Sequence, residues 1–70
     1  MIELDLHGKR HHEVEVVVEN FIIKNQYDVP LRIITGKSSE MQRIVMKAIR
    51  TTRCTQVDTF FEGYIIVHKV

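Results

Sequence analysis

The opening segment of the chain alternates apolar and polar residues with a period of two. Over residues 2–7, the apolar positions share one face of an extended chain and the polar positions share the other: Ile2, Leu4 and Leu6 against Glu3, Asp5 and His7. This alternation predicts a half-buried strand that Gly8 ends.

Two later segments change to the spacing of a helix. Between residues 10 and 26, apolar residues recur three and four positions apart and form one stripe: Val14, Val17, Val18, Phe21 and Ile22. A second stripe has the same spacing: Met41, Ile44, Val45, Ala48 and Ile49. Ser39 and Gln42 fit a capping box, so we expect the second helix to begin at Ser39 and to end near Thr51 and Thr52.

Three more segments have the character of short strands. They cover residues 31–35, 56–61 and 64–69, and a tight turn at Glu62 and Gly63 joins the last two. The predicted order is β-α-β-α-β-β. Right-handed crossovers then place both helices on one face of a mixed four-stranded sheet. The expected fold class is α/β, an α+β two-layer sandwich, in a single domain over residues 1–70 whose other sheet face meets water or a partner.

Composition narrows the location of the protein. The hydrophobic fraction of 44% and the charged fraction of 27% are ordinary for a soluble domain. Cys54 is the single cysteine, so no disulfide forms within the chain, which favours a reducing compartment. The chain opens on a strand pattern instead of a signal peptide, and its longest apolar runs fall far short of the about 20 residues that cross a bilayer. We therefore predict a cytoplasmic protein that does not enter a membrane.

The overall charge leaves the partner open. A net charge of +1 and a pI near 8.0 are too weak to indicate nucleic-acid binding by themselves. Positive side chains gather locally, however, because Lys9 and Arg10 follow the first strand and Lys37 follows the second. In a parallel arrangement they form a phosphate-contacting rim. Four further basic residues are expected along the second helix: Arg43, Lys47, Arg50 and Arg53. For Arg43, Lys47 and Arg50 a solvated helix face is the commoner case.

Asp5 and His7 are candidates for acid–base chemistry. They share a face at the carboxyl end of their strand, where α/β sheets collect functional groups. A carboxylate beside a histidine holds the imidazole in one tautomer or raises its basicity. From the pattern alone, a solvated polar strand face explains the pair equally simply and is the commoner case.

The turn over residues 35–39, TGKSS, lies between a strand and a helix N-terminus. Backbone N–H groups and the helix dipole attract phosphate there, while Lys37 adds a charge and Ser38 or Ser39 a hydroxyl. A Walker A loop also needs a glycine where this chain has Leu31, so a nucleoside triphosphatase is not expected. Taken alone, a plain capped turn is the more common structure.

The histidines do not predict a metal site. His7, His11 and His12 lie close together beside Glu13, but the His-Glu-x-x-His spacing and a second cysteine are both missing. No cofactor is predicted, and a requirement for a divalent metal stays open. Cys54 has no partnered base and is expected to be a small residue near a helix end.

Two segments together resemble the small MutS-related (Smr) domain family. Residues 4–8, LDLHG, followed after four residues by Glu13, are similar to the signature that opens Smr domains, and residues 34–37, ITGK, are similar to the second signature. The similarity covers nearly the whole chain. It implies a fold like the C-terminal domain of translation initiation factor three, binding to DNA or RNA and, as in several members, endonuclease or nicking activity.

Carried over by residue, the resemblance makes Asp5 and His7 the catalytic pair and makes Gly36 and Lys37 the turn that holds phosphate. Glu13 would fasten the first helix to its loop. The chain departs from the family where Ser38 replaces a glycine and where Glu62–Gly63 replaces a glycine-rich segment.

Two alternatives to a nuclease remain. One is a non-catalytic module that binds nucleic acid through the same surface. The other is a protein-interaction module or a weak homodimer, which would use apolar residues expected on the open sheet face: Ile34, Phe60, Tyr64 and Ile66.

Overall fold

Strands and helices alternate along the chain as the periodicity predicts. The computed structural model describes residues 1–52, 56–60 and 62–69. Its elements in chain order are β1 (Ile2–Asp5), α1 (His11–Lys24), β2 (Leu31–Ile34), α2 (Ser39–Thr51), β3 (Gln56–Phe60) and β4 (Tyr64–Lys69).

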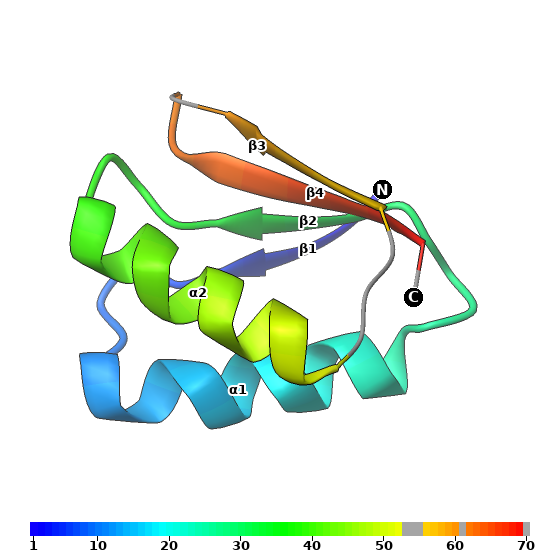
Figure 1. The fold of residues 1–70 in the computed structure, drawn as a ribbon, viewed down its shortest axis with the longest axis horizontal. Helices are drawn as coiled ribbons and strands as arrows, with labels where there is room; N and C mark the ends of the chain where they lie inside the picture. The colour runs from blue at the N-terminus through cyan, green and yellow to red at the C-terminus, as the bar shows by residue number, and fades with distance from the viewer. Residues whose placement is uncertain (53–55, 61, 70) are drawn as a thin grey trace.

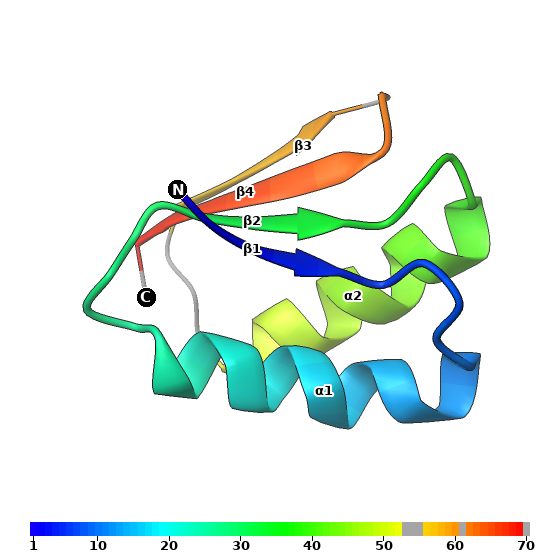
Figure 2. The same ribbon diagram turned by 180° about the vertical axis from the view of Figure 1, so that it is seen from behind.

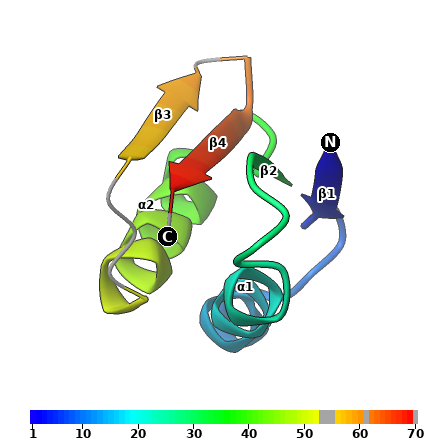
Figure 3. The same cartoon turned by 90° about the vertical axis from the view of Figure 1, so that its right-hand side faces the viewer.

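The strands form one mixed sheet in the order β1-β2-β4-β3. β1 and β2 are parallel, whereas β4 runs antiparallel to both β2 and β3. Two crossovers, β1-α1-β2 and β2-α2-β3, place both helices against the same face of the sheet (Figures 1 and 3). The predicted two-layer sandwich is confirmed.

The hydrophobic core lies between the two layers. The helices and the covered face of the sheet contribute fully or almost fully buried residues: Leu6, Val14, Val18, Ile22, Leu31, Ile33, Met41, Val45, Ala48, Ile49, Ile65 and Val67. The remaining members of the predicted stripes, Val17, Phe21 and Ile44, pack half-buried at the margin. Both helical stripes are therefore confirmed, and each fully buried aliphatic side chain stabilises the fold by about 1.5–3 kcal/mol.

Two predicted details are corrected. β1 ends at Asp5, so His7 lies in the following turn and not on the strand. Helix α2 does begin at Ser39, but its N-cap is Ser38, whose hydroxyl oxygen accepts a hydrogen bond from Met41 N at 3.1 Å. The predicted capping box of Ser39 and Gln42 is wrong, because the extended backbone of Ser38 already puts its hydroxyl over the first helical turn.

Neither helix in the described part of the chain is long and apolar enough to span a membrane.

Candidate nucleic-acid interface

Three turns meet at one edge of the sheet. β1 and β2 are parallel and end there, and β4 begins there, so the β1–α1, β2–α2 and β3–β4 connections gather together. This edge is on the left in Figure 1 and on the right in Figure 2. We call the turns over residues 6–10, 35–38 and 62–63 the turn edge.

His7 occupies the outer part of the first turn. Lys9 N donates to the Leu6 carbonyl at 3.0 Å, and Gly8 has a φ of 80°, as the third position of a type II turn requires. Asp5 Oδ1 accepts a hydrogen bond from His7 N at 2.9 Å. The Asp5 carboxylate therefore holds the backbone of this turn, and the His7 side chain is exposed at the second turn position.

The first turn lies directly beside the second. Parallel pairing sets Asp5 opposite Ile34, and Leu6 N continues the ladder by donating to the Ile34 carbonyl at 3.0 Å. Thr35 and Gly36 follow at once on the neighbouring strand. The predicted proximity of Asp5 and His7 to the glycine–lysine turn is thus present.

Hydrogen bonds on both sides of Gly36 fix the second turn. Thr35 N and Gly36 N both donate to the Gly63 carbonyl, at 2.8 and 2.9 Å. The Gly36 carbonyl accepts from Thr35 Oγ1 at 2.8 Å and from Gln42 Nε2 at 3.4 Å. Because the amide of Gly36 is already used, an anion at this turn would meet the amides that follow it.

Both helices point their N-termini at the turn edge (Figures 1 and 2). In α2, the amides of residues 37–40 find no acceptor among the described residues. In α1, the N-cap residue Arg10 makes no side-chain capping bond. Unpaired N–H groups and the positive ends of two helix dipoles therefore face the same side, which favours a bound anion.

The charges of the side chains add to this preference. Lys9, Arg10 and Lys37 are exposed, and none of them forms an ion pair within the described residues. Glu40, in the first turn of α2, is bound by Arg43, and the hydrogen bond from Arg43 keeps the pKa of the Glu40 carboxyl below its ordinary value. Glu62 is the exposed acid on the third turn.

The turn edge and Asp5, which ends β1 beside it, thus hold all the residues predicted to form the site: Asp5, His7, Lys9, Arg10, Gly36, Lys37 and Ser38. Their roles differ in two respects from the predicted ones. Asp5 bonds the backbone of His7 instead of its imidazole. The Ser38 hydroxyl oxygen is committed to capping α2, so only its proton is available to a phosphate oxygen.

Sequence analysis missed one member of the site, Gly63. A Cβ at Gly63 would stand 2.8 Å from the carbonyl carbon of Gly36, which is closer than real Cβ atoms come. The turn at Glu62 and Gly63 was visible in the sequence, but its contact with Gly36 depends on β4 pairing with β2 and has no local signal.

The role of Asp5 gives a first prediction. Asp5→Ala should cost about 1 kcal/mol of unfolding free energy because the His7 amide loses its acceptor, whereas Asp5→Asn should cost less than about half of that because the amide oxygen still accepts. Urea denaturation measures both losses. Equal losses would show that the carboxylate charge, and not the turn hydrogen bond, is what matters.

The open face of the sheet is lined by polar side chains that contact one another. Arg32 Nη1 binds Glu3 Oε2 at 2.8 Å, its guanidinium lies 5.2 Å from the Tyr64 ring centroid, and His68 Nε2 meets Asp58 Oδ2 at 2.8 Å. Ile66 faces this side by register but is only 5% exposed. Ile34 and Tyr64 are half-buried, and the Phe60 side chain lies outside the described residues. The expected exposed apolar patch is therefore much reduced.

The other predicted candidates, the basic residues of α2 and a metal site, do not extend the candidate interface. On α2, Arg43 pairs with Glu40, and Lys47 Nζ lies 3.8 Å from Glu15 Oε2, as on a solvated helix face. No group of three or more metal-ligating residues occurs in the part of the chain that the structure describes. The predictions for Arg53 and Cys54 fall outside that part.

The Glu13 side chain does not make the expected contact between α1 and its loop. Its backbone N–H donates to the Arg10 carbonyl at 2.9 Å, but its exposed side chain makes no hydrogen bond or ion pair among the described residues. The helix is therefore tied to its loop here by the main chain.

The two segments that resemble Smr signatures build two of the three turns of the turn edge. Comparison with known proteins adds no relative to that resemblance: no family model, no curated protein and no solved structure matches the chain.

Proposed function

We propose that the turn edge binds the phosphate backbone of a nucleic acid in the cytoplasm, as the resemblance to Smr domains implies. The observation that carries the proposal is the meeting of two helix N-termini with three unpaired cations at one edge, within the described residues. A single helix N-terminus suits one small anion. Several donors along one edge suit a polymer of phosphates.

Two of the turns would each contact one of two neighbouring phosphates. The amides after Gly36 and the Lys37 ammonium would hold one phosphate group, with the Ser38 hydroxyl proton beside it. Lys9 and Arg10, on the adjoining turn, would contact the next phosphate along the strand. These contacts reach the backbone and not the base edges, so we expect binding with little dependence on base sequence.

Salt dependence tests the proposal. Binding of short DNA and RNA duplexes should weaken as salt rises, and Lys37→Ala should lower the magnitude of the log–log slope by about 0.9 for DNA, the value for one lost phosphate contact. Fluorescence anisotropy across salt concentrations measures the slope for each duplex.

Lys69→Ala is the matched control. Lys69 is exposed at the far end of β4, away from the turn edge, so its removal should leave the slope unchanged. Two results would contradict binding at the turn edge: an affinity that does not change with salt concentration, or an equal reduction of the salt slope by Lys37→Ala and Lys69→Ala.

A second candidate function is cleavage of the bound strand, which the placement of His7 favours. Its exposed imidazole stands on a turn that Asp5 fixes, which also carries Lys9 and lies beside the Lys37 turn. A neutral imidazole there would take a proton from a water molecule as the water oxygen bonds to phosphorus. The opposite phosphorus–oxygen bond would break, the leaving sugar oxygen would take a proton from solvent, and the cations would stabilise the negative charge that builds up on the phosphate. Asp5 would be a positioning residue in this chemistry.

A further inference from the structure

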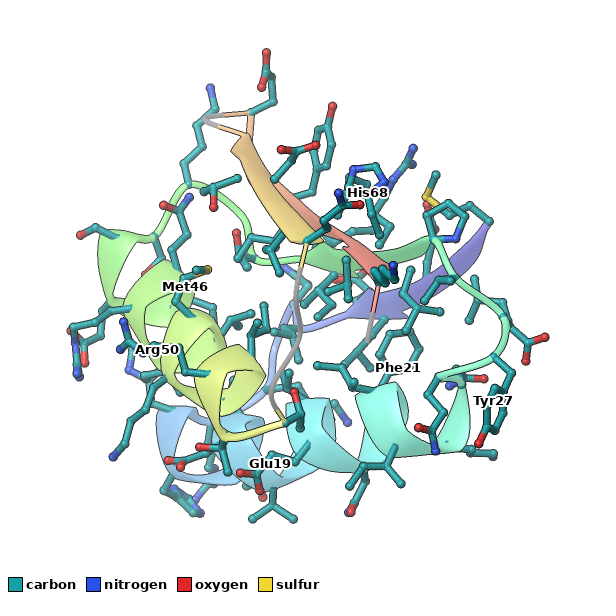
Figure 4. The ribbon with its side chains drawn as sticks, turned by 45° about the vertical axis from the view of Figure 1, so that its right-hand side comes forward. Glu19, Phe21, Tyr27, Met46, Arg50 and His68 are labelled. Atoms are coloured by element: carbon teal, nitrogen blue, oxygen red, sulfur yellow. The ribbon has the colours of Figure 1, made fainter. Side chains whose placement is uncertain are left out.

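Helix α1 carries a second apolar stripe, on the side turned away from the core. Val16 and Ile23 are each 58% exposed, and Asn20 lies exposed between them. Tyr27, just beyond the helix end, is 90% exposed. Figure 4 shows Phe21 pointing from α1 toward the sheet and Tyr27 pointing outward. Exposed aliphatic residues aligned along a helix favour contact with another helix.

The spacing along this stripe is that of a helix that pairs with its own copy. Val16 and Ile23 are two helical turns apart, on either side of the midpoint between Glu19 and Asn20. A two-fold axis through that midpoint sets two copies of α1 antiparallel and brings Val16 against Ile23 of the second copy. The two Glu19 side chains then lie on one flank of the axis and the two Asn20 side chains on the other.

The charges at the two ends of α1 fit the same arrangement. Glu13 and Lys24 are eleven residues apart, about three full turns, so they lie on the same flank of the helix. Both side chains are exposed and form no ion pair within the described residues. With Val16 against Ile23, Glu13 of one copy lies about 3 Å along the helix axis from the level of Lys24 of the second copy, a distance that the two side chains can span. The two-fold axis makes this pair twice.

We infer that the protein associates with a second copy of itself through α1, as an antiparallel two-fold dimer. The stripe is short, so the buried area falls in the range of weak interfaces, below about 1,200 Å² in total. The Glu19 carboxylates of the two copies also approach the axis from one side and weaken the pairing. The turn edge does not take part, so this inference is independent of nucleic-acid binding.

Sedimentation equilibrium tests the dimer. From ~10 µM to ~1 mM, the native chain should pass from monomer toward dimer, as a weak interface requires. Ile23→Asp should leave a monomer throughout. Glu19→Gln should tighten the dimer, because it removes the repulsion at the axis. Far-UV circular dichroism should show that each variant is folded, because Ile23 is exposed and Glu19 is partly exposed.

Charge reversal tests the antiparallel geometry. Glu13→Lys and Lys24→Glu should each raise the dissociation constant of the dimer about fivefold. The double variant should regain most of the lost affinity, because the charge pair is restored with its signs exchanged. Lys69→Glu, an equal charge reversal away from α1, should have no effect. A monomer at ~1 mM, a dimer that survives Ile23→Asp, or a double variant as weak as the single ones would overturn the inference.

Discussion

Gly63→Ala is expected to lower the free energy of unfolding by about 2–4 kcal/mol, the largest single effect on stability at the turn edge. The added Cβ would lie 2.8 Å from the Gly36 carbonyl carbon and 3.0 Å from its Cα, both of which are backbone atoms that cannot rotate away. The φ of 109° adds strain for any residue with a side chain. Urea denaturation gives the loss, and the amide resonances of Thr35 and Gly36 should shift because their shared acceptor moves.

Gly8→Ala separates the cost of the positive φ from the cost of the steric contact. Gly8 also has a positive φ, 80°, but a Cβ there would meet nothing within 4 Å. Its replacement should therefore cost only the backbone term, about 1–2 kcal/mol. If Gly63→Ala and Gly8→Ala lowered the free energy of unfolding equally, the close contact between Gly63 and Gly36 would contribute nothing to the loss.

His7→Ala is expected to reduce strand cleavage by about 10²–10⁴-fold if the turn edge is catalytic, because it removes the only group proposed to move a proton. Asp5→Asn should keep most of the activity, since the turn hydrogen bond survives, and Asp5→Ala should lose more. A nicking assay on plasmid DNA and on structured RNA gives the three rates.

His68→Ala is the control for this series. His68 is an exposed histidine at the far end of β4, bound to Asp58, and its loss should leave cleavage unchanged. Equal cleavage by the native chain and the His7 and Asp5 variants would assign the activity to a contaminant. The turn edge would then be a binding surface alone.

The fold was largely predictable because the opening strand and both helices have a clear period. The residues of α2 place their apolar side chains on one stripe, and this pattern alone located the helix to within a residue. The choice between Ser38 and Ser39 as its cap was not predictable, since both offer the same hydroxyl one position apart. Only the backbone conformation of Ser38 decides it.

The sequence predicted which residues form the candidate site, but not the hydrogen bonds that they make. Alternation placed Asp5 and His7 on one face, and it could not show that the strand stops at Asp5 and frees the His7 amide for the carboxylate. Likewise, register puts Ile66 on the open face, but the lack of exposure at that position results from the surrounding tertiary packing. Contacts across the sheet, such as Gly63 with Gly36, depend on long-range pairing that local patterns do not contain.

The position of β4 has a consequence for how the molecule is assembled. β4 follows β3 in sequence, but it lies between β2 and β3 in the sheet, and the turn that leads into it supplies the Gly63 carbonyl that holds the Gly36 turn. Until β4 inserts, β2 presents an unpaired edge that is open to other extended chains, and the Gly36 turn lacks its anchor. Ligand binding at the turn edge should therefore report on completed folding, and a chain cut before residue 62 should be both inactive and prone to aggregate.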